Sequence, residues 1–502
     1  MQSDNLASVG TTAPAGTAQE LKREFTLWSA FTFAFAFISP IVCLYAIFAI
    51  TFAAGGPASW WGFLFVFAGQ ILVALVLAEL ASRYPLEGSV YQWSRVLGGA
   101  TYGWFTGWAY MWTLALAMAA VGYGAAGFVP TILGVEPFSQ GTQLLVAIGL
   151  VAFATFANIV GRTFMKVLLA GSILAEIIGS VVIGTVLLLF FRENPVSIVF
   201  DTAGTGQGPG GYLFGGLFAA MAFIGWGFVG FESAGAIAEE VREPRRDVPK
   251  AIIFSLIFVS LIVIYSAFAL ILAIPDIPAV LAGEVVDPVA ETMTAQLGSA
   301  LTSPLFALFL IGFMASLLAL QGSCSRVMWA FARDGVLPAS GWLKRLSSEE
   351  RIPRNTVIVA GCVAALLLLA TNSERIYFTL LSFTTGGFYL VFLLPVLGAL
   401  ISRLRGRWEE GPFNLGRLGL TVTLVATVWL VFELLNISWP RAGDLPWYQN
   451  WGVAVMIAVV GVLGVLTYLP LRERISRVHG MTGERDAAPA SSAGVGTDEA
   501  SR

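Results

Sequence analysis

Long stretches of this chain contain no charged residue, and this feature limits the folds open to it more than any other. No Asp, Glu, Lys, Arg or His lies between Glu24 and Glu79, between Arg95 and Glu136, or between Glu291 and Arg326. A transmembrane helix needs about 20 mostly apolar residues, so the first stretch holds two helices, separated near residues 55–57. Only 12% of all residues are charged, against about 25% in a soluble domain. We therefore predict an all-α polytopic membrane protein.

The apolar segments divide the chain into about twelve predicted transmembrane helices. They run near residues 28–54, 60–82, 99–128, 143–161, 166–191, 212–239, 250–273, 304–332, 355–372, 376–401, 416–436 and 449–471. This pattern predicts a transmembrane domain over residues 25–475, preceded by a cytoplasmic segment, residues 1–24. Residues 476–502 end in an Ala-, Ser-, Gly- and Asp-rich stretch without an apolar run, so we expect a disordered cytoplasmic tail there.

Lys and Arg are distributed unequally between the two sides that these segments define. Alternate loops, beginning with the N-terminal segment, hold nearly all of them, whereas the opposite side has only Arg192, Arg375 and Arg441. Cytoplasmic loops of membrane proteins carry an excess of Lys and Arg. We therefore predict a multi-pass protein of the cytoplasmic membrane, with both termini in the cytoplasm.

The first apolar segment contains a helix-breaking residue near its middle, in the stretch FISPIV (residues 37–42). Inside a helix, Pro40 removes a backbone donor and clashes with the preceding turn, which at least kinks the helix. Ser39-Pro40 is also the pattern of an N-cap followed by a proline at the first helical position. The segment is therefore interpreted either as one kinked helix or as two half-helices, the second beginning at Ser39.

The sixth apolar segment contains the stretch AFIGWGFVGFES (residues 222–233), which includes Gly225, Gly227, Gly230 and Glu232. Glycines permit close packing between membrane helices. Packing alone does not explain the glutamate, because a carboxylate costs roughly 2.5–3.5 kcal/mol at the bilayer centre on insertion scales. A break at the glycines does explain it, since Glu232 then lies in the first turn of a second half-helix, where the helix dipole favours an acid.

The two breaks occupy corresponding positions, which predicts two inverted five-helix repeats, residues 28–191 and 212–401, with a binding site between them. Two further helices, residues 416–471, follow. In this arrangement the second half-helices direct free N–H groups to the membrane centre, where they can bind a carboxylate. The first half-helices direct carbonyls there, which suits an ammonium group or a coupling cation. Trp226 and Phe228 could close over an amine through cation–π contacts; the alternative for both is lipid contact or core packing.

Three stretches resemble the amino acid–polyamine–organocation (APC) superfamily of permeases. GFVGFESAGAIAEEVREPRRDVPKAI (residues 227–252) is similar to that group's sixth helix and the loop after it, AELASRYPLEGSVYQWS (78–94) to the end of its second helix, and ARDGVLP (332–338) to the loop after its eighth. The second stretch resembles the amino acid/choline branch most closely. The resemblance implies ten core helices in two inverted repeats plus two more, and transport by alternating access.

The resemblance also implies roles for residues at both breaks. The substrate-binding positions that it implies are Ser39, Pro40, Ile41, Gly225, Trp226, Gly227, Phe228 and Gly230. Trp226 matches an aromatic gate, and Glu232 matches an acidic position linked to proton sensing or coupling. Many relatives have a small, glycine-rich triplet at the first break, whereas Pro40 offers no N–H here. A carboxylate-free amine is therefore an alternative to an amino acid as the substrate.

Other charged residues fall within or beside the apolar segments. Glu176 lies about ten residues past Lys166, which places it about 15 Å into the fifth segment. It either faces the bundle interior, protonated or hydrogen-bonded, or binds a coupling ion, and it is the second candidate for ion or proton coupling after Glu232. Arg326 is interpreted as snorkelling or structurally paired. The charged residues 239–246 are interpreted as a solvated loop in preference to an ion-pair network.

These features predict a proton-coupled secondary transporter that imports an amino acid or related organic amine. Sodium coupling and exchange without an ion are alternatives, as is a permease or exchanger for choline, ethanolamine or polyamines. The chain has no Walker A pattern, so we do not expect ATP to drive transport directly. A polytopic membrane enzyme is the alternative from another class, but the loops lack the clustered Asp, Glu or His that such enzymes usually need. The expected partners are the substrate, a coupling proton or sodium ion and the lipid bilayer; we expect no cofactor, metal or nucleic acid.

Overall fold

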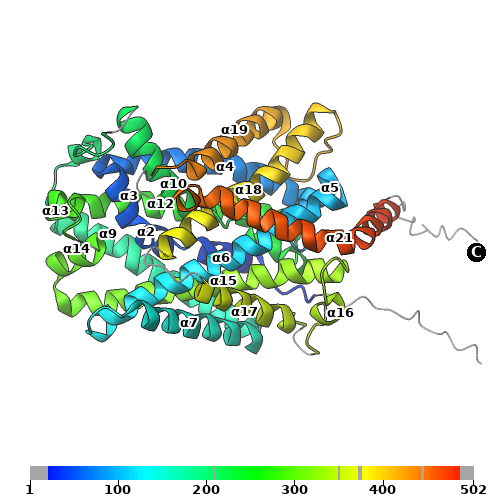
Figure 1. The fold of residues 1–502 in the computed structure, drawn as a ribbon, viewed down its shortest axis with the longest axis horizontal. Coiled ribbons are helices and arrows are strands. Elements are labelled where there is room, and N and C mark those ends of the chain that lie inside the picture. Colours follow the sequence, from blue (N-terminus) through cyan, green and yellow to red (C-terminus); the bar gives the residue numbers. More distant parts are fainter. Residues whose placement is uncertain are drawn as a thin grey trace, which may run out of the picture.

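The computed structural model describes residues 21–207, 210–285, 287–348, 351–370, 376–441 and 446–486, and its fold is shown in Figure 1. Across these ranges the regular structure is helical, apart from one isolated β-bridge between Phe25 and Val241. The all-α prediction is therefore confirmed. Most of the predicted N-terminal segment (residues 1–20) and the end of the predicted tail (487–502) lie outside the described residues.

The membrane-spanning helices agree with the predicted set. In the described part of the chain ten helices are long and apolar enough to cross a membrane, and two shorter apolar helices, Leu213–Gly227 and Arg354–Ala370, bring the set to the predicted twelve. In chain order the helices that form the spans are α1 (Leu27–Ile38), α2 (Pro40–Tyr45), α3 (Phe48–Gly55), α4 (Trp60–Arg83), α6 (Ala100–Leu133), α7 (Gln140–Val160), α8 (Arg162–Glu176), α9 (Ile183–Phe190), α10 (Phe218–Gly227), α11 (Ser233–Ala236), α12 (Pro244–Ala273), α15 (Ser299–Arg333), α17 (Arg354–Ala370), α18 (Ile376–Leu404), α19 (Gly419–Ser438) and α21 (Gly452–Asp486). A π-helical turn, Ile177–Val182, joins α8 to α9.

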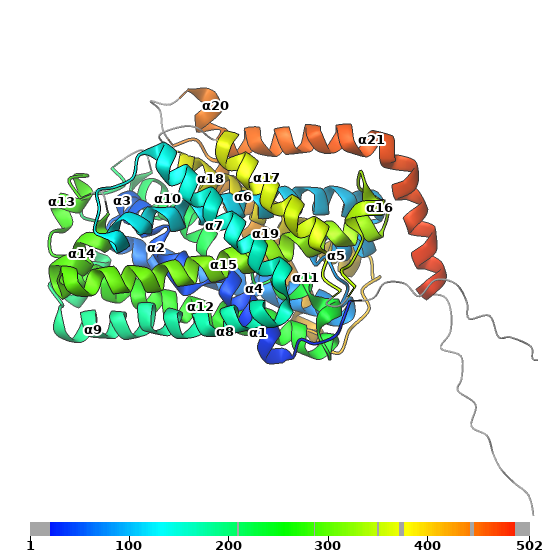
Figure 2. The same cartoon turned by 90° about the horizontal axis from the view of Figure 1, so that it is seen from below.

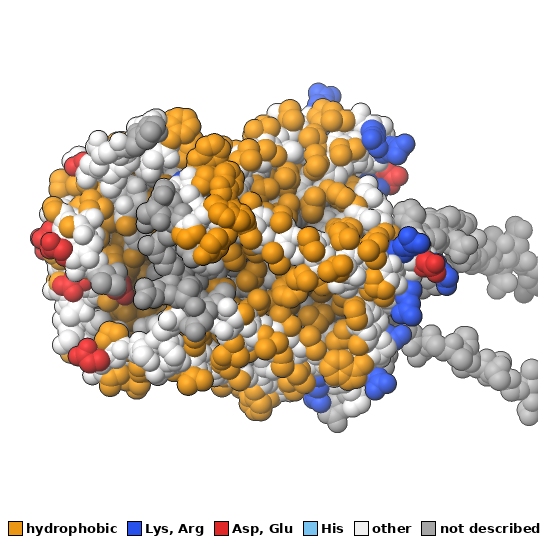
Figure 3. Space-filling view, viewed as in Figure 1, with side chains coloured by type: hydrophobic (Ala, Val, Ile, Leu, Met, Phe, Trp, Pro, Cys, Tyr) orange, Lys and Arg blue, Asp and Glu red, His pale blue; other side chains and the backbone are white. Residues whose placement is uncertain are grey.

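The two ends of the bundle carry opposite charges. In the face shown in Figure 3, Lys and Arg gather at one end and Asp and Glu at the other, with a broad apolar surface between them. The short helices α5 (Val90–Gly98) and α16 (Ser340–Leu343) lie at the Lys/Arg end, and α13 (Ile277–Leu281) and α14 (Pro288–Leu297) at the opposite end (Figure 1). We call these the basic end and the acidic end. The short helix α20 (Trp447–Asn450) precedes α21.

The broken helices lie at the centre of the bundle. Of the most apolar window of each span, 78% is buried in the span α1–α2 but only 17% in α21, and Figure 2 shows α21 along the outer edge. A helix that is buried on nearly all sides belongs to the core. α1 packs against α11, and α2 packs against α10. The first half of each broken span therefore meets the second half of the other, as antiparallel spans require.

Candidate functional site

The first span is interrupted at Ser39. α1 ends at Ile38, and the Ser39 N–H closes it by donating to the Phe35 carbonyl at 2.8 Å. Ser39 has a φ of 53°, a left-handed conformation that costs an L-residue roughly 1–3 kcal/mol. Its Oγ then accepts from the Val42 N–H at 3.1 Å, and Pro40 occupies the first position of α2. Of the two interpretations of this segment, two half-helices are what the structure contains.

The sixth span is interrupted after Gly227. α10 ends there, α11 begins only at Ser233, and Glu232 directly precedes it. Gly230, with a φ of 104°, turns the chain between them, a conformation that glycine adopts without steric cost. Trp226 is 7% exposed, and Phe228 is fully buried with its ring edge-on to Phe63 of α4.

The glycines also bring the two breaks into direct contact, so both explanations offered for them hold. A Cβ at Gly227 would lie 2.0 Å from the Cys43 Sγ of α2, and a Cβ at Gly230 would lie 2.1 Å from the Phe37 ring of α1. Either contact is too short to persist, so a side chain at these positions would displace Cys43 or Phe37 from its present packing. The predicted residues of the first break and of the sixth therefore lie on adjoining elements in the bundle centre.

Glu232 is completely buried beside the second break. Its Oε1 accepts a hydrogen bond from the Tyr110 hydroxyl of α6 at 2.7 Å, and its backbone carbonyl accepts one from the Ser89 Oγ at 3.0 Å. Its Oε2 has no hydrogen-bond partner among the described residues. An ionised carboxylate away from water is costly unless a cation pairs with it, so this group is suited to binding a proton or facing a cationic ligand.

Glu176 reaches the first break from the fifth span and is also completely buried. Its Oε1 accepts a hydrogen bond from the Ser39 Oγ, and its Oε2 accepts one from the Ile41 N–H at 2.9 Å. The two candidate coupling glutamates therefore lie at different breaks. Sequence reasoning placed Glu176 in the membrane but did not anticipate that it binds the break itself.

The backbone donors at the start of α2 are all in use. Pro40 has none, Ile41 donates to Glu176, and Val42 and Cys43 donate to the side-chain and backbone oxygens of Ser39, at 3.1 and 2.8 Å. We predicted from the sequence that these N–H groups would be free for a ligand, which is not the case here. In this structure a protein carboxylate fills that position.

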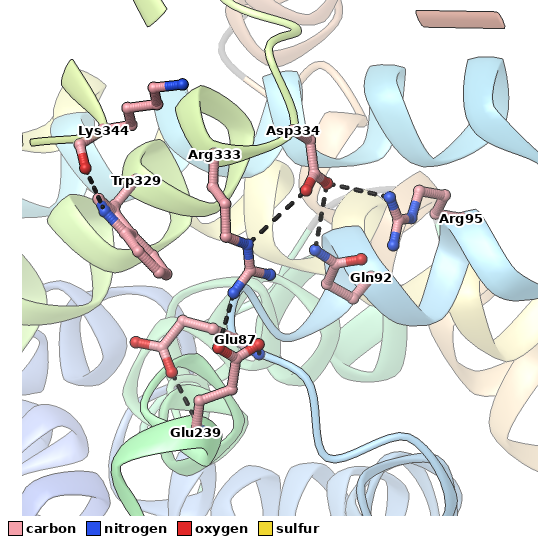
Figure 4. A network of polar contacts seen from close by, with 8 residues as sticks. All are labelled: Glu87, Gln92, Arg95, Glu239, Trp329, Arg333, Asp334 and Lys344. Atoms are coloured by element: carbon pink, nitrogen blue, oxygen red, sulfur yellow. Dashed lines mark hydrogen bonds and ion pairs between the residues drawn. The ribbon is translucent and has the colours of Figure 1, made fainter. Parts of the chain in front are cut away.

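The motifs at the basic end converge in one polar network (Figure 4). Asp334 accepts hydrogen bonds from Tyr91 at 2.7 Å and Arg95 at 3.0 Å. Arg333 pairs with Glu239 at 2.6 Å. The backbone N–H groups of Glu87 and Glu239 each donate to the other's carboxylate at 3.1 Å. Burial and the neighbouring carboxylates of Glu240 and Glu239 raise the pKa of Glu87 well above its usual range.

A buried ion pair extends this network. Arg326 of α15 donates to Glu240 at 2.9 Å, and the two side chains are 1% and 0% exposed. The preference for a fully solvated loop over residues 239–246 was therefore wrong for Glu239 and Glu240, although Arg242, Arg245 and Arg246 are exposed. Charge density along the chain did not reveal that α15 supplies the opposite charges. The interpretation of Arg326 as structurally paired agrees with this geometry.

Glu433 of α19 is a further buried glutamate within a span, and it was not singled out from the sequence. It accepts a hydrogen bond from Asn436 at 3.2 Å, and Asn436 also donates to the Phe218 carbonyl of α10 at 2.9 Å. These contacts fasten α19 to α10. The signal that identified Glu176 and Glu232, a carboxylate within an apolar segment, applies equally to Glu433.

Comparison with known proteins agrees with the paired breaks and the converging motifs. The sequence model of a family described as amino acid permease matches residues 25–463, nearly the whole chain. The chain belongs to this amino acid permease family. The superfamily inferred from the three motifs is thereby confirmed.

Relatives of this permease come from distant organisms. It is 28% identical over 482 residues to an uncharacterized amino-acid permease of Schizosaccharomyces pombe, covering 90% of this chain and 84% of the relative. It is 26% identical over 464 residues to the amino-acid permease BAT1 homolog of Oryza sativa, covering 86% and 88%. It is 28% identical over 370 residues to the branched-chain amino acid permease BcaP of Lactococcus lactis, covering 70% and 75%. These names point to transport rather than to an enzymatic reaction.

Proposed function

We propose that this permease is a proton-coupled secondary transporter that imports an amino acid across the cytoplasmic membrane by alternating access. The substrate would lie between the two breaks, bounded by residues 39–41 and by Gly225, Trp226, Gly227, Phe228 and Gly230. The concentration of Lys and Arg at the basic end supports placing that end, and both termini, in the cytoplasm.

The main support for proton coupling is the environment of Glu232. Its carboxylate is buried, receives one hydrogen bond from Tyr110 and has one oxygen without a partner among the described residues. Its backbone carbonyl is bound by Ser89, whose loop also carries Glu87 of the basic-end network. Ser89 therefore connects the backbone of Glu232 to the network around Glu87, which lies two residues earlier in the chain. In the proposed mechanism, a change in the protonation of Glu232 is transmitted through this connection to the contacts that close the cytoplasmic side.

Alternating access requires one side to be closed while the other opens. The ion pairs Arg326–Glu240 and Arg333–Glu239 join α15 to the loop after α11. The segment before α1 adds to this closure, because the Phe25 N–H donates to the Glu240 carbonyl and the Arg242 N–H donates to the Phe25 carbonyl, both at 2.9 Å. These contacts support a cytoplasmic side that is closed in this conformation.

A carboxylate-free amine is the second candidate substrate. Pro40 removes one donor at the first break, and Glu176 occupies the Ser39 hydroxyl and the Ile41 N–H. A cationic amine could face Glu176 without displacing it. The names of the relatives favour an amino acid, so we keep that class first.

The test is uptake into proteoliposomes with an imposed pH gradient, acid outside, using wild type, Glu232→Gln and Glu433→Gln. A thermal-shift screen of the twenty amino acids, choline, ethanolamine and polyamines selects the substrate. We expect Glu232→Gln to lose gradient-driven accumulation while keeping substrate exchange, and the equally buried Glu433→Gln to keep both. Undiminished gradient-driven accumulation by Glu232→Gln would overturn the role given to this residue.

A further inference from the structure

Among the described residues, Glu176 is the only carboxylate that contacts the first break, and its side chain is tightly packed there. It bonds the Ser39 Oγ and the Ile41 N–H. A Cβ at Gly312 of α15 would lie 3.0 Å from its Oε1 and 3.1 Å from the Ile41 Cβ. The absence of a side chain at Gly312 thus makes room for the carboxylate between α15 and α2.

The donors that hold Glu176 are those to which a substrate carboxylate would bind in the proposed function. The remaining donors at the start of α2 are bound to Ser39. A second carboxylate cannot reach the hydroxyl of Ser39 and the N–H of Ile41 while Glu176 stays. Two ionised carboxylates sharing one site repel each other strongly, so a ligand carboxylate and an ionised Glu176 exclude each other.

The surroundings of Glu176 contain no permanent positive charge among the described residues. The titratable side chains on which its charge acts are Cys43 and Tyr45, both on α2. The Tyr45 hydroxyl donates to the Gly179 carbonyl of the π-helical turn at 2.8 Å, and Ser266 of α12 donates to the Ser180 carbonyl at 3.2 Å. α15 contributes Gly312. If the carboxylate leaves its two donors, no neighbouring cation replaces them.

We propose that Glu176 is a tethered competitor of the substrate carboxylate. The substrate carboxylate displaces Glu176 from the Ser39 hydroxyl and the Ile41 N–H, and Glu176, having lost both donors, takes up one proton from the extracellular solution. That proton is released when the substrate leaves and Glu176 returns to the break. This inference rests on the proposed import of an amino acid and adds to it a second proton site, with one proton bound at Glu176 for each substrate carboxylate.

The competitor model distinguishes ligands with and without a carboxylate. An amino acid must displace Glu176, so its binding carries a proton and weakens as the pH rises. The corresponding decarboxylated amine leaves Glu176 in place and can pair with it, so its binding does not weaken with pH. This difference in the pH dependence of binding between the two ligands is due to Glu176, and not to Glu232, which lies at the other break.

The experiment measures dissociation constants of purified permease in nanodiscs between pH 5.5 and 8.5. The ligands are the amino acid that stabilises the permease most in the thermal-shift screen and its decarboxylated counterpart. For the amino acid we expect wild type to bind about tenfold more weakly for each pH unit above the titration of Glu176, the slope of one linked proton. Glu176→Gln should bind it with no such slope, while the matched control Glu433→Gln keeps the wild-type slope.

Calorimetry of wild type in two buffers with different ionisation enthalpies counts the protons directly and does not depend on any variant folding. Uptake of about one proton with the amino acid and none with the amine supports the proposal. Binding of the amino acid without proton uptake, or an unchanged slope in Glu176→Gln, overturns it while leaving the proposed function intact. Failure of every amino acid to bind, with binding of an amine, instead overturns the amino acid assignment and the competitor role together.

Discussion

Removing one partner of the buried Arg326–Glu240 pair should strongly destabilise the permease. The two charges are 2.9 Å apart and 1% and 0% exposed. At an effective dielectric constant of 20, two unit charges at that distance attract by roughly 6 kcal/mol. Desolvation offsets much of this attraction, but Arg326→Met leaves Glu240 buried without its cation, a change that typically costs about 3–5 kcal/mol.

A double-mutant cycle measures this coupling. The free energy of unfolding would be obtained by denaturant titration of wild type, Arg326→Met, Glu240→Gln and the double variant in mixed micelles. We expect the double variant to recover most of the loss, because neither charge is then left alone. Arg246→Met serves as the control, since the Arg246–Glu243 pair is 69% and 66% exposed and such pairs contribute about 0–1 kcal/mol. Additive single losses, or a loss in Arg326→Met no larger than in the control, would refute the reasoning.

Three further predictions concern the breaks and the basic end. Gly227→Ala should abolish uptake, because its Cβ would lie 2.0 Å from the Cys43 Sγ. Gly341→Ala is the control and should leave uptake unchanged, because the space around its Cβ is open. Normal uptake by Gly227→Ala would show that the breaks need not touch. Tyr110→Phe should shift the pH profile of uptake, because it removes the only hydrogen bond that another side chain donates to the Glu232 carboxylate in the described chain. Tyr102→Phe should not shift it, because the Tyr102 hydroxyl, also on α6, donates to the Leu394 carbonyl of α18 instead; identical profiles for the two variants would count against coupling at Glu232. Burial raises the pKa of Glu87, so the folded protein holds its proton more tightly than the unfolded chain does. Wild-type stability should therefore fall as the pH rises from about 4.3, the ordinary pKa of a glutamate, through the pKa of Glu87 in the folded protein. Thermal unfolding of Glu87→Gln should show a shallower decline with pH, and an equal decline would exclude Glu87 as its source.

The spans and their breaks could be predicted from the sequence because their causes are local. A bilayer requires about 20 consecutive apolar residues, and Pro40 or the run Gly225, Gly227 and Gly230 interrupts a helix wherever it occurs. The position of Glu176 within the fifth span followed from counting residues from Lys166. These features depend on residues that are near one another in the chain.

The contacts made by the site residues could not be predicted in the same way. Glu176 binds Ser39 and Ile41 across 137 and 135 residues, and Tyr110 binds Glu232 across 122. Such partners are set by which helices pack together, and no local pattern records that. The solvated-loop interpretation of residues 239–246 failed for the same reason, since the cation for Glu240 comes from α15.

A cryo-electron microscopy map of the permease in nanodiscs with its best-binding amino acid would show whether the two broken helices enclose the substrate. We expect ligand density between residues 39–41 and residues 225–230, with the ligand carboxylate on the Ile41 N–H and the Glu176 side chain withdrawn. Ligand density elsewhere in the bundle would contradict the site. Ligand at the breaks with Glu176 still bound to Ile41 would contradict the competitor role while leaving the site intact.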